Sequence, residues 1–364
     1  MPAIDRISIH GFKSIAAVDG LTLGPVTVLI GANGSGKSNF LAIFSLLRAV
    51  REDRVREYVA KAGGAARILH LGPKVTEIVR IRIEFGNQGF QYDVSFSPDD
   101  ADRLLPGPEE FRGVDPGNRS FGGDWPLTEE MLVVTAGREI AAGVLRRLDS
   151  WRSYHFHDTG AGAAIKLTAH INDNRYLRTD GANLPAFLYL LRELHPAAYT
   201  AIRNAVQLVA PFFDDFVLEP QRLNPEMIRL EWRHRYTDAY FDVSSLSDGT
   251  LRFIALATTL LQPLLLRPAV ILIDEPELGL HPYAVTLLAS LIKVAAVETQ
   301  IILATQSPQL LDHFRPEDVV IADLIDGGTR LGRLDPDRLA EWLEEYSLGQ
   351  LWEKNELGGR PGGA

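Results

Sequence analysis

Val26-Thr-Val-Leu-Ile30, followed by Gly31-Ala-Asn-Gly-Ser-Gly-Lys37-Ser38, is the stretch of this sequence that decides its fold. The apolar run is typical of a buried strand, and the turn after it fits the pattern G-x-x-x-x-G-K-[ST] at each specified position. A helical pattern begins at Phe40. Glycines let backbone N–H groups converge on a polyphosphate, and the first turn of a helix adds further unpaired N–H groups. The stretch therefore predicts a strand, a loop and a helix that together hold a nucleoside triphosphate.

Individual residues of this loop have expected parts in binding ATP and Mg²⁺. We expect Lys37 to reach the β- and γ-phosphates and count it among the catalytic residues. The Ser38 hydroxyl is an expected ligand of Mg²⁺, which prefers oxygen. The nucleotide-binding residues expected from this stretch are Gly31, Ala32, Asn33, Gly34, Ser35, Gly36, Lys37, Ser38 and Asn39.

The composition excludes several classes of protein. A chain of 364 residues that is 46% hydrophobic can bury a large core, in one domain or two. The chain has no cysteine, which excludes disulfides, thiolate metal sites and cysteine nucleophiles. This fits a reducing compartment, and we expect a cytoplasmic protein. The formal net charge of −10 argues against a chain-wide grip on nucleic acid, although a local basic face, and hence DNA as a partner, stays open.

The longest apolar stretch, Phe253 to Ile273, has the length of a membrane span. Polar residues and prolines interrupt its middle, so we expect a buried helix followed by a buried strand, and no association with a membrane. Asp274 and Glu275 follow this strand directly. The carboxyl end of a strand in a parallel sheet is where ligands bind. Asp274 is therefore expected to complete the Mg²⁺ shell, and Glu275 to orient and polarise the attacking water.

A second candidate site for an anion lies earlier in the chain, at Ser247-Asp-Gly249. Ser247 is a good helix cap, Gly249 permits close approach of the backbone, and the start of a helix attracts negative charge. The spacing to the acidic pair is 274 − 248 = 26 residues. We therefore read this segment as part of the same site.

Four segments carry a resemblance to a known family. Leu246-Ser-Asp-Gly-Thr-Leu-Arg252 resembles the signature motif of ABC-class ATPases, and Ile271 to Pro282 resembles their Walker B segment and D-loop. Ile301 to Pro308 resembles their switch strand, and Ile9 to Ser14 is similar to the first strand of SMC and RecF proteins. By these segments the chain is identified as a stand-alone RecF-like member of the SMC/RecF/OLD group, whose members are often described as predicted AAA-type ATPases.

The resemblance implies an α/β fold: a P-loop NTPase of the ABC class, with a mixed core sheet flanked by helices and an inserted, mainly helical lobe. It implies Mg²⁺-dependent ATP hydrolysis as a conformational switch in a head-to-tail homodimer that forms with ATP. The signature of one subunit, with Ser247, Asp248 and Gly249, would contact the nucleotide of the other. Glu275 would be the catalytic base, and the D-loop with His281 would cross the interface. The implied setting is DNA repair, such as double-strand break repair or recombination, or phage defence alongside a separate nuclease or effector.

The chain departs from the family pattern at three places. Gln306 stands in the switch strand where relatives commonly have histidine; it can hold the γ-phosphate or water but cannot carry a proton, so we expect slow turnover. His281 stands where many relatives have aspartate. No glutamine stands out as a Q-loop residue, and a predicted strand from Tyr154 to Asp158 offers His157 and Asp158 as candidates.

The expected domain boundaries follow from the motifs and the breaker residues. Residues 1–96 form the first part of the ATPase domain, 97–215 the inserted lobe, 216–330 the second part, and 331–364 a C-terminal helix and tail. Prolines and glycines predict a long loop or lid over 97–126. The 247 − 38 = 209 residues between phosphate loop and signature are too few and too broken for SMC-type arms.

Two other functions stay open at this point. The chain could be the ATP-binding subunit of a membrane transporter, which the missing switch histidine and the large insertion oppose. It could also be a nucleotide-sensing scaffold with little hydrolysis.

Predicted local structure includes a hairpin of residues 78–85 and 90–96, a first helix reaching about Tyr58, and helices over 128–150, 183–194 and 199–209. An amphipathic helix is predicted over 339–351, either packed on the ATPase core or docked to a partner.

Overall fold

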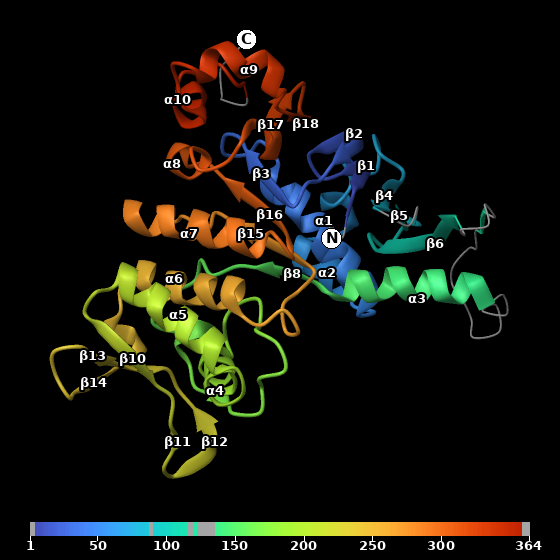
Figure 1. The fold of residues 1–364 in the computed structure, drawn as a ribbon. Coiled ribbons are helices and arrows are strands. Elements are labelled where there is room, and N and C mark those ends of the chain that lie inside the picture. The colour runs from blue at the N-terminus through green and yellow to red at the C-terminus, as the bar shows by residue number, and fades with distance from the viewer. Residues whose placement is uncertain (1–3, 87–89, 115–119, 122–134, 359–364) are drawn as a thin grey trace. The chain divides into compact units, whose positions relative to one another are not determined.

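The computed structural model describes residues 4–86, 90–114, 120–121 and 135–358 (Figure 1). The chain divides into two compact units. Unit 1 comprises residues 1–151, 269–272 and 299–364, and unit 2 comprises residues 152–268 and 273–298. We expected an inserted lobe over 97–215, but the segment from 97 to 151 belongs to unit 1.

An antiparallel sheet forms the N-terminal part of unit 1, with strand order β2-β1-β4-β5-β6-β7. The strands are β1 (Arg6–Phe12), β2 (Ile15–Thr22), β4 (Val79–Phe85), β5 (Phe90–Pro98), β6 (Leu104–Val114) and β7 (Ser120–Phe121). Buried and exposed residues alternate along β4, as its sequence predicts, and the hairpin of β4 and β5 is confirmed. The predicted long loop over 97–126 is wrong where the structure describes it, because residues 104–114 form β6 and pair with β5. Residues 115–119 and 122–126 lie outside the described residues.

The second sheet has the order β18-β17-β3-β16-β15-β8. Its strands are β3 (Val26–Ile30), β8 (Trp151–Tyr154), β15 (Val270–Asp274), β16 (Gln300–Thr305), β17 (Val319–Ile325) and β18 (Gly328–Arg333). β3 lies between β16 and β17 and runs parallel to both, while β17 and β18 are antiparallel. Every residue of β3 and β16 is buried, because neighbours cover both faces. The predicted mixed core sheet is confirmed.

Helix α1 (Lys37–Arg51) follows β3 and buries one apolar face in unit 1. The buried residues include Phe40 and Phe44, and the Phe44 ring meets Trp151 edge-on at 5.4 Å between centroids. The predicted continuation of this helix to Tyr58 is wrong, because Asp53 adopts a left-handed backbone conformation at φ 54°. The chain then starts a separate helix, α2 (Val55–Ala62), which ends at Gly63 with φ 85°.

Unit 2 holds four longer helices and two small antiparallel sheets. The helices are α4 (Leu184–Leu194), α5 (Pro196–Val209), α6 (Asp248–Leu261) and α7 (Pro282–Ala295). The sheets are β10 (Phe213–Val217), β13 (Glu231–His234) and β14 (Tyr240–Asp242), and β11 (Pro220–Gln221), β12 (Asn224–Ile228) and β9 (Ala169–His170). The helices predicted at 183–194 and 199–209 are confirmed. The predicted strand from Tyr154 to Asp158 is wrong, since β8 ends at Tyr154 and irregular backbone follows.

The remaining helices of unit 1 are α3 (Thr135–Asp149), α8 (Pro308–Leu311), α9 (Pro336–Leu343) and α10 (Leu348–Glu353). Single 3-10 turns occur at Ala65–Arg67, Ala164–Lys166, Val243–Ser245 and Pro316–Asp318. The predicted tail helix is split into α9 and α10. Leu351 and Trp352 of α10 are buried, whereas no residue of α9 is. Within the described part of the chain, no helix is long and apolar enough to cross a membrane.

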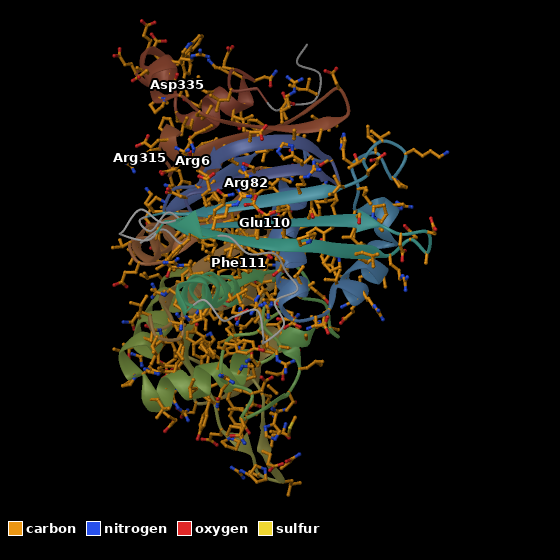
Figure 2. All side chains as sticks on the ribbon, turned by 90° about the vertical axis from the view of Figure 1, so that its right-hand side faces the viewer. Arg6, Arg82, Glu110, Phe111, Arg315 and Asp335 are labelled. Atoms are coloured by element: carbon orange, nitrogen blue, oxygen red, sulfur yellow. The ribbon has the colours of Figure 1, made fainter. Side chains whose placement is uncertain are left out.

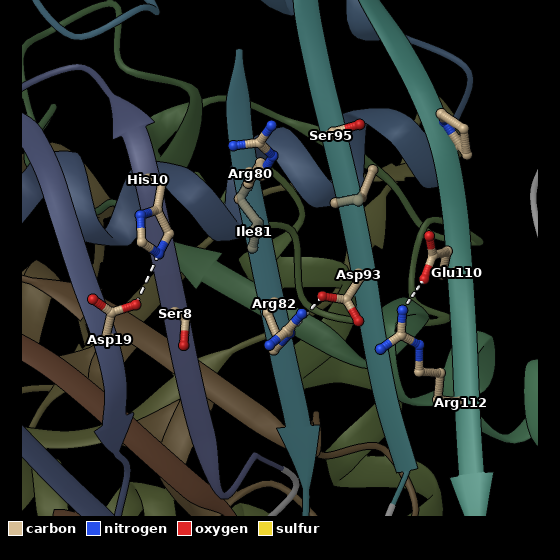
Figure 3. Close-up of a pocket in the computed structure, with 12 residues that line it drawn as sticks. Ser8, His10, Asp19, Arg80, Ile81, Arg82, Asp93, Ser95, Glu110 and Arg112 are labelled. Atoms are coloured by element: carbon tan, nitrogen blue, oxygen red, sulfur yellow. Dashed lines mark hydrogen bonds and ion pairs between the residues drawn. The ribbon is translucent and has the colours of Figure 1, made fainter. Parts of the chain in front are cut away.

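One face of the antiparallel sheet carries a polar hollow (Figure 3), and two residues that line it, Arg82 and Glu110, are labelled in Figure 2. Its three acidic side chains each contact a basic one: two of these pairs join neighbouring strands, and Glu110 contacts Arg112 on the same strand. His10 contacts Asp19 at 2.9 Å, and Arg82 contacts Asp93 at 2.6 Å. Exposed pairs of this kind contribute about 0–1 kcal/mol each. These pairs therefore stabilise the sheet little, and they leave the hollow with little net charge.

Candidate functional site

The predicted phosphate loop, Gly31 to Ser38, connects β3 to α1 and depends on glycine at two points. Gly36 precedes the helix with φ 101°, and a Cβ there would lie 2.0 Å from the Thr329 hydroxyl oxygen. A Cβ at Gly31 would lie 2.2 Å from the Ala322 carbonyl oxygen. Both distances are far below van der Waals contact. The backbone of the loop is therefore pressed against β17 and β18 in a form that only glycine allows.

Lys37 lies inside this loop and is only 5% exposed. Its Nζ donates to the carbonyl oxygens of Gly31 at 2.6 Å and Ala32 at 2.9 Å. The ammonium group is therefore held beside the N-terminus of α1, where the helix dipole favours an anion. The residues expected to bind phosphate are thus brought together within unit 1, with the Ser38 side chain exposed beside them.

A chain of side-chain hydrogen bonds supports the loop from behind. The Thr329 hydroxyl lies 2.7 Å from Ser14 Oγ and 2.8 Å from the Ser35 carbonyl, which can only accept. Thr329 therefore donates to Ser35 and accepts from Ser14, and Ser14 accepts from the Asn39 amide at 2.7 Å. The side chain of Asn39, which we expected to bind nucleotide, is engaged in this chain. Sequence reasoning missed the roles of Ser14 and Thr329; only Ser14 lies in a recognised motif.

Gln306 leaves the core sheet next to the phosphate loop. The register of the parallel strands pairs Thr305 with Ile30, so that Gln306 and Gly31 are the next residues on two adjacent strands. Ser307 then caps α8 through a bond from the Leu310 N–H at 3.1 Å. The cap and the strand end fix the backbone on both sides of Gln306. The predicted switch residue is therefore placed at the same edge of the sheet as the loop.

Both predicted acidic residues belong to unit 2, where Asp274 ends β15 and Glu275 follows it. The Asp274 Oδ1 atom is buried and has no hydrogen-bond partner among the described residues. An unsatisfied buried oxygen of this kind costs about 1–3 kcal/mol, and a cation with oxygen ligands would remove that cost. The predicted metal ligand therefore fits Mg²⁺ by its own chemistry. Its partner in the prediction, Ser38, belongs to unit 1.

Glu275 has a left-handed backbone at φ 43°, which is strained for a residue other than glycine. A tight turn follows, in which the Leu278 N–H donates to the Glu275 carbonyl at 3.2 Å and Gly279 has φ 75°. His281 ends the turn as the cap of α7, because its Nδ1 accepts the Tyr283 N–H at 3.3 Å. The predicted catalytic base thus starts a compact turn, and His281 has a structural task at its end.

The predicted signature segment starts α6 in unit 2. Ser247 caps the helix, accepting the Thr250 N–H at 3.1 Å. A Cβ at Gly249 would lie 2.2 Å from the Gly279 carbonyl oxygen, so the helix start is packed closely on the turn after Glu275. Lys166, whose side chain is 10% exposed, lies 3.4 Å from Asp248 and offsets its charge. Signature residues and D-loop are therefore brought together within this unit.

The segment after β8 begins with His155, on which the negative charge of Asp274 acts. The two candidates for the Q-loop residue, His157 and Asp158, lie in the irregular segment that follows β8. Desolvation of the ring lowers the pKa of His155. The charge of Asp274 raises this pKa, and the charge of His157 lowers it. The His155 Nε2 lies 3.1 Å from Ser153 Oγ.

Comparisons with known proteins agree with this geometry. Residues 26–312 match a protein family described as "AAA domain, putative AbiEii toxin, Type IV TA system". No curated protein matches the sequence. Among solved structures, an SmcHead bound to the C-winged helix domain of ScpA is similar, with a TM-score of 0.63 and 17% identity over 93% of this chain and 100% of that one.

A second similar structure is the Smc head domain with an extended coiled coil from Pyrococcus furiosus, bound to the C-terminal domain of ScpA. It has a TM-score of 0.57 and 18% identity over 95% of this chain and 99% of that one. A third is the Smc head domain with a coiled coil and joint from Pyrococcus yayanosii, with a TM-score of 0.53 and 14% identity over 95% of this chain and 99% of that one. These likenesses establish an SMC-head type of P-loop ATPase fold.

Proposed function

This chain belongs to the AAA-domain family that matches its residues 26–312, and from that membership we propose that it hydrolyses ATP with Mg²⁺ and uses the reaction as a conformational switch. The observation that carries the proposal is the position of Lys37. Its Nζ lies within 2.9 Å of two loop carbonyls, at the start of α1, where a triphosphate would place its β- and γ-phosphates.

The residues of the site divide the chemistry among them. Ser38 and Asp274 would hold Mg²⁺, which neutralises phosphate charge and stabilises the developing negative charge on the transferred group. Glu275 polarises the attacking water as general base. Gln306 orients that water or the γ-phosphate by hydrogen bonds, but its amide cannot accept a proton and pass it on. Turnover is therefore slow.

The nucleotide is proposed to be shared between two copies of the chain that associate when ATP binds. Support comes from the start of α6, a helix end that attracts negative charge, where Ser247 is the cap and Gly249 packs on the turn after Glu275. In a head-to-tail dimer these groups meet the γ-phosphate held by the Lys37 loop of the other copy. Hydrolysis removes the γ-phosphate and releases the dimer.

The biological setting is proposed by resemblance: DNA repair, or defence against phage with a separate effector protein. Two of the similar SMC heads are bound to ScpA domains, which supports a partner protein on a fold of this kind. DNA is the second proposed partner. Stimulation of ATP hydrolysis by double-stranded DNA that fades as salt is added would support the DNA partner, since phosphate contacts release counterions. Equal rates of ATP hydrolysis with and without DNA would argue against DNA as a partner and leave only the protein partner as a proposal.

The test of the core proposal compares Lys37→Ala with the wild type. The variant is expected to lower ATP turnover by at least about a hundredfold, as the loss of a preorganised charge at a reacting phosphate does. It is also expected to abolish the rise in mass that we predict for the wild type with ATP, as measured by light scattering. Lys61→Ala, which removes an exposed ion pair with Glu57, is the matched control and should behave as wild type. Wild-type turnover in Lys37→Ala would overturn the proposal.

A further inference from the structure

One arginine of unit 2 joins three segments of the proposed site. The Arg252 guanidinium donates from Nε to the Phe156 carbonyl at 3.1 Å and from Nη2 to the His157 carbonyl at 2.7 Å. Its Nη1 donates to the Leu278 carbonyl at 2.8 Å. Each of the three nitrogens therefore donates to a different carbonyl. Phe156, His157 and Leu278 are 96, 95 and 26 residues away from Arg252 along the chain.

These three segments are the ones that hold the chemistry of unit 2. Arg252 itself belongs to α6, five residues after the capping Ser247. Phe156 and His157 lie in the irregular segment that follows β8, and His157 is a candidate for the Q-loop residue. Leu278 lies in the tight turn that Glu275 starts. The guanidinium therefore links the signature helix to the turn that follows the acidic pair and to the segment after β8.

Close packing reinforces the same link. The start of α6 leaves no room at Gly249, where a Cβ would come within 2.2 Å of the Gly279 carbonyl. A Cβ at Gly279 would in turn lie 2.8 Å from Arg252 Nη1. Because close-packed groups transmit displacement instead of absorbing it, the helix start and the turn shift together.

We propose that Arg252 is a positioning residue that makes the signature helix, the Glu275–Leu278 turn and the segment after β8 move as one body. This inference rests on the proposed function of the site. Contact of a phosphate with Ser247 in an ATP-bound dimer would then set the position of the turn that carries Glu275. Only arginine suits the task, because its planar fork carries five donors in fixed directions, whereas a lysine ammonium is a single point.

Nucleotide binding by the monomer should not depend on Arg252, whereas dimer formation and hydrolysis should. The loop around Lys37 lies in unit 1, and none of the three bonds of Arg252 reaches it. Arg252→Ala is therefore expected to keep the affinity of the monomer for a fluorescent ATP analogue within about threefold. Turnover and the ATP-dependent dimer should fall at least about tenfold, the loss expected when hydrogen bonds of a charged group are removed. Arg252→Lys should recover less than half of the lost rate.

Arg267 offers a matched control at the other end of the same helix. Its Nε and Nη2 donate to the Gln262 carbonyl at 3.1 Å and 2.7 Å, and Gln262 is the C-cap of α6. Arg267→Ala thus also removes hydrogen bonds from a guanidinium to a backbone carbonyl, but not bonds to the turn that Glu275 starts. It is expected to lower the melting temperature without a matching loss of kcat or of the dimer. Equal kcat in Arg252→Ala and Arg267→Ala would overturn the inference.

Amide hydrogen exchange of the nucleotide-free chain tests the link between Arg252 and the turn without depending on ATP turnover. Faster exchange over residues 276–280 in Arg252→Lys than in wild type, with no change in Arg267→Ala, is expected. Unchanged exchange in Arg252→Lys would refute the link even if Arg252→Ala did not fold. If the wild type neither dimerises nor hydrolyses ATP, the proposed function fails, and the exchange result still decides whether Arg252 fixes the turn.

Discussion

Thr329 donates its hydroxyl proton to the Ser35 carbonyl across 2.8 Å, although 294 residues separate them in the chain. Ser35 lies in the phosphate loop, and Thr329 lies on β18, at the edge of the core sheet. Thr329 is 1% exposed, so water cannot replace the bond readily. The backbone of the loop is therefore held from its rear by a residue that no phosphate-loop motif contains.

Replacing this hydroxyl should weaken both the fold and nucleotide binding. Thr329→Val keeps the shape of the side chain but leaves the Ser35 carbonyl and the Ser14 hydroxyl without their partner. We expect a loss of about 1–3 kcal/mol in the free energy of unfolding, measured with urea, and weaker binding of a fluorescent ATP analogue. Thr329→Ser retains the hydroxyl and is the control. Unchanged stability in the valine variant would argue against the bond.

Two glycines of the phosphate loop should respond differently to the same substitution. Gly36→Ala places a Cβ 2.0 Å from Thr329 Oγ1 and should abolish ATP binding, because either the loop or β18 must move. Gly34→Ala meets nothing within 4 Å and has only the strain of its φ of 80° to overcome. That strain costs about 1–2 kcal/mol. Calorimetry of ATP binding should show loss in the first variant and retention in the second.

Glu275 should show a conflict between stability and activity. Its side chain is the proposed base, while its backbone has φ 43°. Glu275→Gln should lose turnover and accumulate the ATP-bound dimer, as seen by mass. Glu275→Gly should also be inactive, yet more stable than Glu275→Ala by about 1 kcal/mol, because only glycine adopts this conformation without strain. A scaffold without hydrolysis would instead show the same ATP turnover in Glu275→Gln and wild type.

Glu109 on β6 should make the stability of unit 1 depend on pH. It is 2% exposed and accepts the Tyr92 hydroxyl at 3.0 Å. Desolvation raises its pKa above the ordinary 4.5, although Tyr92 and Arg51 act against this. The folded state therefore holds the proton more tightly than the unfolded state, and the stability present below pH 4.5 is lost as the pH rises through the raised pKa.

Glu109→Gln removes this penalty while the amide oxygen still accepts from Tyr92. The variant should be more stable than wild type at about pH 8, and the difference should shrink toward about pH 4.5. Urea unfolding at several pH values measures both slopes. Parallel stability curves for the two proteins would contradict the assignment of the pH dependence to Glu109.

The phosphate loop, the signature and the acidic pair could be predicted because each is a local pattern. Glycine, lysine and capping serine act on neighbouring backbone, so their spacing is visible in the sequence. β6 could not be predicted, since Pro106, Gly107 and Pro108 favour a loop. The strand forms because its pairing with β5 is irregular between Val94 and Phe96, which accommodates the prolines.

The support around the site could not be predicted for a different reason. Thr329 bonds to Ser35, and Arg252 to His157, across separations of 294 and 95 residues, and neither contact leaves a periodic signal. The strand that we predicted from Tyr154 to Asp158 is wrong because β8 ends at Tyr154, and sequence patterns do not fix such boundaries. Local chemistry was therefore visible, while the groups that position it were set by tertiary structure.

The location of β3 between β16 and β17 has a consequence for synthesis on the ribosome. Both neighbours of that strand are translated about 270 residues or more after it, and Thr329 emerges later still. A nascent chain that already contains the glycine-rich loop therefore has no partner strand for β3. Because β16 and β17 pair with β3 only after so long a separation in sequence, folding is slow. Release of ribosome-bound chains ending before residue 300 should give products that cannot retain ATP, so competence for nucleotide arises only after β16 and β17 have been translated.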